Sequence, residues 1–183
     1  MNGPRPPLSV ESARALFVYN RNVFYRFVAR VERLPAKASR RSRGIGHLSL
    51  FDTLVHVLNV HEAWIAYILP GRVRELPARF REPDRHPKDW AGFHTYETRV
   101  WTEVDRYLAG LTAKELARTV RAPWMPGRYS VSDALFQTTF EEAHHLGEII
   151  GALWQEDRAP PDMTWIDIGR APVRRATKPR TRR

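Results

Sequence analysis

The chain contains no cysteine among its 183 residues. Disulfide bonds, thiolate metal sites and cysteine nucleophiles are therefore excluded, and the composition fits a reducing cytoplasm, where we expect the protein to act. The chain also lacks any run of about 18 apolar residues, so no transmembrane helix is expected. Its first seven residues, Met-Asn-Gly-Pro-Arg-Pro-Pro, contain no apolar core of a signal peptide, so secretion is not expected either.

Several motifs of well-defined chemistry are missing as well. The sequence has no glycine-rich phosphate loop, no G-x-S-x-G nucleophile motif and no zinc-finger spacing. Phosphate-loop nucleotide binding, the serine hydrolase mechanism of that motif and zinc-finger DNA binding are therefore not expected.

The formal net charge of +10 suggests a nucleic-acid partner until the charges are located. Residues 170–183 contain seven basic residues and no acidic ones, and without them the net charge is +3. This segment is rich in alanine and proline and cannot build a core, so we expect a disordered basic tail. Residues 1–169 are expected to form one domain that binds neither a specific nucleic acid nor a membrane.

Four long segments have the apolar spacing of amphipathic helices. Serine caps precede the first, second and fourth of them, and the pairs Ser49–Asp52 and Ser130–Asp133 have the spacing of capping boxes. Pro70-Gly71 ends the second segment. The expected helices cover residues 9–33, 49–69, 87–109 and 130–156.

These helices predict an all-α protein, a four-helix bundle in which residues 70–87 form a connection long enough to cross between the second and third helices. Neither an internal repeat nor a strand pattern is found.

The fourth helix contains the residues with the clearest chemistry, Glu141-Glu142-Ala143-His144-His145-Leu146-Gly147-Glu148. Glu141 and His145 are four residues apart, so they lie on one helical face and can share a divalent cation. Glu142 falls inside the apolar stripe, where its charge must be paired, neutralised or bound to a metal. The alternative is that Glu141, His144 and Glu148 form a solvated face and that His145 is a boundary histidine.

A third ligand would have to come from another helix, and the second helix offers two histidines. His56 shares a narrow polar sector with Asp52 and Asn59, whereas His61 lies about 140° away around the helix. The two therefore cannot serve one site. Amphipathicity favours His61 as the more buried residue, but periodicity does not decide which histidine is the ligand.

A di-iron carboxylate centre is the rival type of metal site, because the fourth helix contains two overlapping E-x-x-H motifs. That architecture needs a further E-x-x-H motif and two more glutamates on separate helices. The first and third helices contain glutamates but no E-x-x-H, so this type of site is not expected.

The chain resembles the DinB family of four-helix-bundle metalloproteins, which is sometimes grouped with thiol-dependent S-transferases and mycothiol-dependent isomerase-like proteins. The likeness covers roughly residues 9–156. It rests on Leu16-Phe17-Val18-Tyr19-Asn20, on Leu48-Ser49-Leu50, Leu54-Val55-His56 and Trp64, and on residues 141–148, which are similar to the family pattern H-x-x-H-H-R-G-Q.

The resemblance implies one divalent ion held by His56, Glu141 and His145, although Glu141 stands where the family has a histidine. The Arg and Gln of the family pattern are also replaced, by Leu146 and Glu148. Zinc is the first expectation for the ion, and nickel, iron and manganese are alternatives. Asp52, Glu142 and His144 are then candidates for orienting the ligands or polarising a bound water.

The same resemblance implies a metal-dependent transferase or hydrolase that acts on a small molecule through a thiol or hydroxyl nucleophile. The alternative is a non-enzymatic dimeric bundle whose metal site is vestigial or purely structural. In either case a homodimer is expected.

Overall fold

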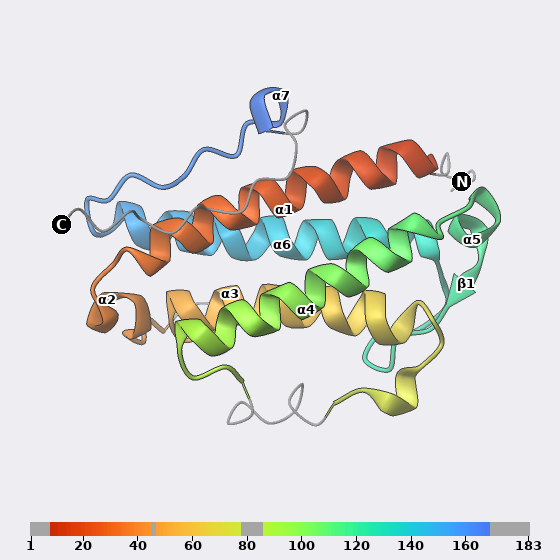
Figure 1. Ribbon diagram of the computed structural model, residues 1–183, viewed down its shortest axis with the longest axis horizontal. Helices are drawn as coiled ribbons and strands as arrows, with labels where there is room; N and C mark the ends of the chain where they lie inside the picture. Colours follow the sequence, from red (N-terminus) through yellow and green to blue (C-terminus); the bar gives the residue numbers. More distant parts are fainter. Residues whose placement is uncertain (1–7, 45–46, 78–85, 169–183) are drawn as a thin grey trace.

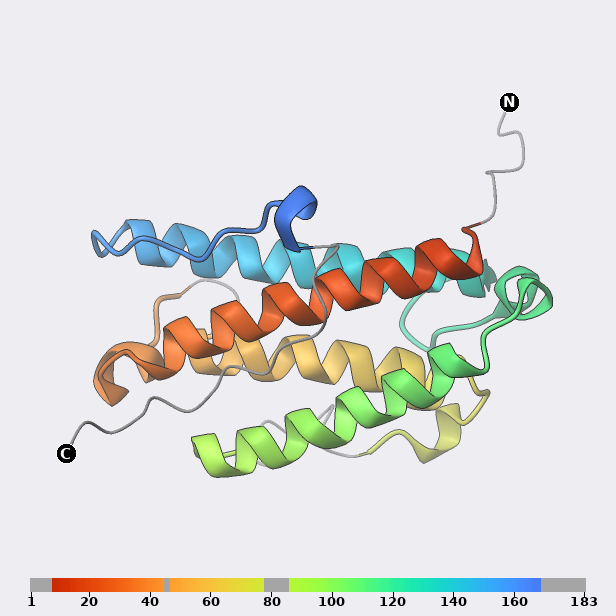
Figure 2. The same ribbon diagram turned by 45° about the horizontal axis from the view of Figure 1, so that its top comes forward.

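The computed structural model describes residues 8–44, 47–77 and 86–168. Four long helices lie alongside one another in it (Figures 1 and 2). They are α1 (Val10–Glu32), α3 (Leu50–His61) with its continuation η1 (Glu62–Ile68), α4 (Trp90–Ala109) and α6 (Val131–Trp154). The expected all-α four-helix bundle is confirmed.

Serine side chains cap three of the four helices at the predicted residues. The hydroxyls of Ser9, Ser49 and Ser130 each accept a hydrogen bond from the backbone N–H three residues further on. At α6 the Asp133 carboxylate also accepts from the backbone N–H of Ser130, which completes a capping box. These bonds satisfy backbone donors that have no partner inside a helix, and they fix where each helix begins.

The third long helix begins later than the sequence predicts. Its N-cap is Asp89, whose carboxylate accepts a hydrogen bond of 2.7 Å from the backbone N–H of Gly92. Aspartate is a strong N-cap, so α4 begins at Trp90 and not near residue 87.

The second helix is not one continuous α-helix, contrary to the prediction for residues 49–69. From Glu62 to Ile68 the backbone is a π-helix. The N–H of Leu69 donates to the carbonyl of Trp64 at 2.8 Å, an i→i+5 bond. Apolar spacing cannot separate these two helix types over so short a stretch. Gly71, at φ 80°, then turns the chain out of the helix.

The chain crosses the bundle between its second and third long helices. Figures 1 and 2 show α3 and α4 running in one direction, and α1 and α6 running in the other. Parallel neighbours need a long connection, and residues 69–89 provide it, including the 3₁₀ turn η2 (Val73–Glu75). In the resulting arrangement α6 packs against both α1 and α3, while α4 packs against α3 and η1. Residues of the second and fourth long helices are thereby brought side by side.

Two short helices, α2 (Ala36–Arg40) and α5 (Ala113–Ala117), lie at opposite ends of the bundle, and a third, α7 (Trp165–Ile168), packs against the side of α1 (Figure 1). The expectation that the chain has no strand is wrong, because β1 (Thr119–Val120) and β2 (Tyr129–Ser130) pair in antiparallel fashion just before α6. Strands of two residues are too short to show an alternating pattern in the sequence.

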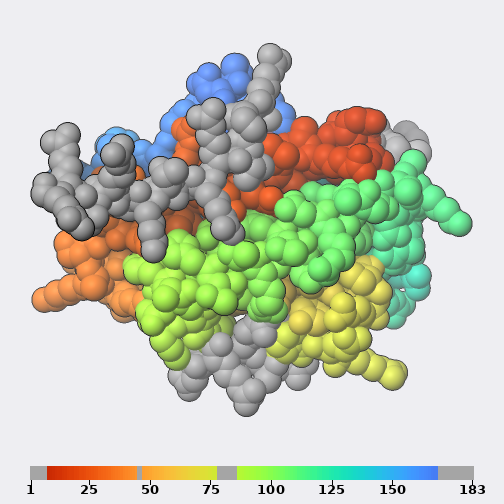
Figure 3. All heavy atoms as spheres, in the orientation of Figure 1, coloured from red at the N-terminus to blue at the C-terminus, as the bar shows by residue number. Residues whose placement is uncertain are grey.

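Large aromatic side chains fill the core. Those of Phe17, Phe24, Phe27, Phe51 and Phe93 are all at most 1% exposed, and they come from α1, α3 and α4. Burying an aromatic ring of this size contributes roughly 1.5–3 kcal/mol. The space-filling view shows α1 and α4 covering one face of the bundle, so α3 and α6 lie largely behind them (Figure 3).

No described helix is long and apolar enough to cross a bilayer. The proposed basic tail, residues 170–183, lies outside the described residues.

Candidate metal centre

His56 lies on α3, on the side that meets α6. Its imidazole ring is 4.5 Å from that of His145, measured between centroids. Burial, together with the neighbouring imidazoles of His47, His145 and His86, lowers the pKa of His56 to about 3. The ring is therefore neutral at physiological pH. A neutral imidazole is the form that binds metals.

His145, on α6, is 7% exposed and lies between two carboxylates of its own helix. Its Nδ1 is 2.8 Å from Oε2 of Glu148, and its Nε2 is 3.4 Å from Oε2 of Glu141. When Nδ1–H donates to Glu148, Nε2 keeps its lone pair and faces away from that carboxylate. A carboxylate that fixes one ring nitrogen so that the other can bind a metal is a common feature of metal sites. Sequence reasoning did not assign this role to Glu148.

A third imidazole, which the sequence analysis did not select, belongs to His47 in the segment before α3. Its ring stacks on that of His56 with centroids 3.4 Å apart and planes 14° apart, and lies 5.0 Å from that of His145. We call His47, His56 and His145 the histidine cluster. One ligand atom from each lies within 4.8 Å of the other two.

One sequence signal could have pointed to His47. It stands two residues before the N-cap of α3, so it is tied to the same end of the helix that carries His56. The sequence does not show that His47 lies against the bundle, where its ring reaches His56.

Glu141, the carboxylate ligand predicted from the sequence, contacts the cluster from one side. Its Oε1 accepts a hydrogen bond of 2.8 Å from the side-chain amide of Gln137, and its Oε2 faces His145. The side chain is 34% exposed. Of the three predicted ligands, the structure brings His56 and His145 together, while Glu141 contacts His145 alone, at the solvent side.

The predicted supporting residues have other partners. The carboxylate of Asp52 accepts a hydrogen bond from the hydroxyl of Ser49 at the start of α3. His144 is 66% exposed in its side chain, and its Nε2 lies 3.6 Å from Glu148. Asp52 therefore acts at the helix cap. His144 contacts the carboxylate of Glu148, which also contacts His145 of the cluster, and it does so from the solvent side.

Glu142 forms a buried ion pair with the second histidine of the second helix. Its Oε2 is 2.6 Å from Nε2 of His61, with side-chain exposures of 3% and 0%. The His61 ring also packs against the aromatic rings of Phe17 and Trp101, with centroids 5.7 Å and 4.8 Å away. The amphipathic pattern had indicated that His61 is the more buried of the two histidines, and the structure confirms it.

A polar network that includes Asn59, in the same sector of α3 as His56, holds a fourth imidazole near the cluster. The Asn59 amide nitrogen lies 3.2 Å from Nε2 of His86. The hydroxyl of Tyr96 lies 2.6 Å from Oδ1 of Asn59 and 2.7 Å from Glu62, whose other oxygen accepts from Arg99 at 2.7 Å. Glu62 is the first residue of the π-helix. The network therefore connects the point where the α-helix becomes a π-helix to Asn59 and His86 near the cluster.

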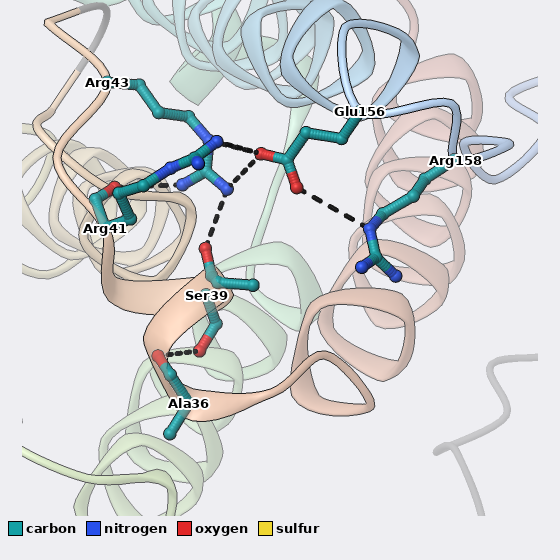
Figure 4. Close-up of polar contacts among 7 residues, drawn as sticks. Ala36, Ser39, Arg41, Arg43, Glu156 and Arg158 are labelled. Atoms are coloured by element: carbon teal, nitrogen blue, oxygen red, sulfur yellow. Dashed lines mark hydrogen bonds and ion pairs between the residues drawn. The ribbon is translucent and has the colours of Figure 1, made fainter.

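The segment that carries His47 is held against the end of α6 by two arginines (Figure 4). The Arg43 guanidinium donates to Glu156 at 2.6 Å and to the carbonyl of Ala38 at 2.7 Å, and Arg41 donates to the same carboxylate at 2.8 Å. The side chain of Arg43 is only 7% exposed. Charge-assisted hydrogen bonds of this kind are stronger than neutral ones, and here they join two elements more than 100 residues apart in sequence.

The contact between these arginines and Glu156 makes the stability of the fold depend on pH. Burial raises the pKa of Glu156, but the hydrogen bond and charge of Arg43, with the charges of Arg41 and Arg158, outweigh it and hold the pKa below its ordinary value of 4.5. The stabilisation is therefore full above pH 4.5 and is lost as the pH falls through the lower folded-state value.

We expect the Glu156→Gln variant, measured by urea denaturation, to lose less stability than the unchanged protein between pH 5 and pH 3. Equal losses would contradict this role for Glu156.

The chemistry of the donors in the histidine cluster fits a divalent metal ion. Four ligands arranged as a tetrahedron around zinc at 2.0–2.1 Å lie about 3.4 Å from one another. Donor atoms within 4.8 Å of one another reach that spacing through small rotations of the side chains. Uncharged imidazoles are ligands for zinc, nickel and iron, so the site suits the metals expected from the sequence.

A family model described as DinB superfamily matches residues 21–149. The chain belongs to the DinB superfamily. No curated protein matches it. The matched range contains every residue of the histidine cluster as well as Glu141. The DinB assignment agrees with the four-helix bundle seen in the structure.

The DinB pattern implies imidazole ligands at His56 and at both ends of the 141–145 pair, and in this chain the first of that pair is a glutamate. The structure contains a third imidazole close to His56 and His145, but it comes from His47 and so from a different part of the chain.

Proposed function

We propose that this DinB protein binds one divalent metal ion between α3 and α6 and uses it to transfer a group to, or hydrolyse, a small molecule. The observation that supports this proposal is the histidine cluster, in which three imidazoles from two helices and a loop share one small volume. His56 and His145 are predicted ligands that also belong to the histidine cluster, and Glu141 is the third ligand predicted from the sequence. Zinc is the first candidate for the ion.

A bound divalent ion would supply Lewis-acid activation of a thiol or hydroxyl group. The protein would contribute the rest. Glu148 holds the His145 ring through Nδ1 and thereby keeps Nε2 oriented toward the site. Glu141, partly exposed and within 3.4 Å of that nitrogen, is placed to accept a proton from an approaching nucleophile.

Elemental analysis tests the proposal directly. Protein prepared without a histidine tag should contain close to one divalent ion per chain. Since no tag is present to bind metal, that ion would be bound by the protein's own histidine cluster. The chelated protein serves as the control, and it should take up one equivalent of Zn²⁺ again. If the untagged protein neither carries nor takes up a stoichiometric metal, the proposed function is wrong.

The alternative proposal is a non-enzymatic bundle in which the metal is structural or the site is vestigial. Its support is that Glu141 replaces a family histidine. An ion that binds only the folded chain stabilises it in either role, so the melting temperature does not distinguish the two proposals. Turnover of small thiol or hydroxyl substrates does: the first proposal expects turnover that is lost on chelation and restored by the ion, and the second expects none with the ion bound. Assembly as a homodimer stays a prediction, which a measurement of molar mass in solution tests.

A further inference from the structure

We propose that His47 supplies the third metal ligand of this protein, in place of the residue at position 141. The inference rests on the proposed function, because it concerns the ion that His56 and His145 bind. It makes the ligand set three imidazoles, one of which comes from the loop before α3. Glu141 then lies beside the ion and does not hold it.

The position of His47 supports this assignment over Glu141. Its ligand nitrogen lies within 4.8 Å of donor atoms on both His56 and His145, whereas Glu141 does not belong to that group. Glu141 touches His145 alone and is also hydrogen-bonded to Gln137. A ligand must approach all the others, and among the described residues around the site His47 does so.

The backbone beside His47 gives an independent indication. Leu48 has φ 72°, in the left-handed region that costs a residue with a side chain about 1–2 kcal/mol. Its side chain is 64% exposed, so burial of the leucine does not compensate for that cost. Its carbonyl accepts a hydrogen bond of 2.8 Å from the N–H of Arg43, which closes the turn. Backbone strain of this kind gathers at functional sites, and this turn is what folds His47 back onto His56.

Described residues on both sides of His47 are held in place. On one side Arg43 is bonded to Glu156 just after α6, and on the other Ser49 caps α3. A small hollow lined by Leu48, Thr53 and Glu148 among others has room for about one water molecule. The contacts of Arg43 and Ser49 help to hold the His47 imidazole in a defined position, as a ligand requires.

With His47 as a ligand, the carboxylate of Glu141 becomes free for another task. The position where the family pattern has a ligand histidine carries a carboxylate in this chain. The site keeps three imidazoles, and the Glu141 carboxylate lies at its solvent side.

Zinc titration of the chelated, untagged protein tests the assignment. We expect His47→Ala to weaken Zn²⁺ binding by more than about 100-fold, beyond the 10–100-fold typical of residues that only support a ligand. Glu141→Gln should weaken it by less than about 10-fold. The matched control Leu48→Gly relieves the left-handed strain and should bind Zn²⁺ as tightly as the unchanged chain. Circular dichroism establishes that each variant is folded.

A second measurement does not depend on any variant. In the unchanged protein labelled with ¹⁵N on histidine, Zn²⁺ should shift the imidazole resonances of His47, His56 and His145 together, and leave those of His61 in place.

The outcomes separate the two proposals. If the unchanged chain binds no Zn²⁺, the proposed function fails and this inference fails with it. If it binds Zn²⁺ but His47→Ala binds equally well and Glu141→Gln does not, only the assignment of His47 is wrong. Zinc-dependent shifts at His56 and His145 without one at His47 would have the same meaning.

Discussion

Replacing His61 with alanine lowers the free energy of unfolding by about 3–5 kcal/mol, the range for breaking a buried ion pair from one side. The substitution leaves the Glu142 carboxylate 3% exposed without its partner at 2.6 Å, and it opens a cavity next to Phe17 and Trp101. For a chain of this size the melting temperature should fall by about 10 °C. Metal content should not change, because the His61 side chain is paired with Glu142 and lies outside the histidine cluster.

Two variants serve as controls for the His61 result. Replacing His61 and Glu142 together by leucine removes both charged groups, so the double variant should recover most of the lost stability. Removing His56 should do the opposite of removing His61, with metal lost and thermal stability little changed. If the two histidines exchange these effects, the assignment of the ligand to His56 is wrong.

The largest effect on metal binding is expected from His145→Ala. This residue is the one member of the histidine cluster on α6, and its side chain is 7% exposed. The variant should lose stoichiometric metal, and by elemental analysis it should contain less than about a tenth of the ion bound by the unchanged chain. Its helical content should persist, because buried apolar residues and not the ion supply most of the stability.

The matched control for His145 is its neighbour His144. That side chain is 66% exposed and contacts Glu148 from outside, so His144→Ala removes an imidazole of the same helix without removing a ligand. It should keep full metal occupancy. Full occupancy in His145→Ala, or loss of metal in His144→Ala, would rule out the cluster as the binding site.

The helices could be located from the sequence because their ends are coded locally. Ser9, Ser49 and Ser130 each cap a helix through a side chain three residues from its partner, an interaction that needs no tertiary structure. The burial of His61 could also be inferred, because a repeat of 3.6 residues places it among leucines. The length of the connection allowed a crossover but did not require one.

The rest depends on contacts between distant parts of the chain. The π-helix begins at Glu62, which is held by Tyr96 and Arg99 from α4, and apolar spacing does not report such a contact. His47 reaches the cluster only through the left-handed turn at Leu48, a conformation that a leucine does not signal. The partner of Glu142 could not be named either. Its position in the apolar stripe shows that it needs a partner, but which residue that is depends on how the helices pack.

The π-helix also makes one stretch of the chain tolerant of a lost residue. An i→i+5 turn accommodates one more residue than the α-helical turn it replaces. Deleting one residue from Glu62 to Ile68 would therefore let the segment rewind as an α-helix and leave the residues after it close to their present directions. Rewinding at full length would instead rotate everything after it by about 100°, and Leu69, fully buried at 0% exposure, would turn out of the core. A single deletion in this segment should therefore harm the fold less than a single deletion in the α-helical part of the same helix, Leu50–His61.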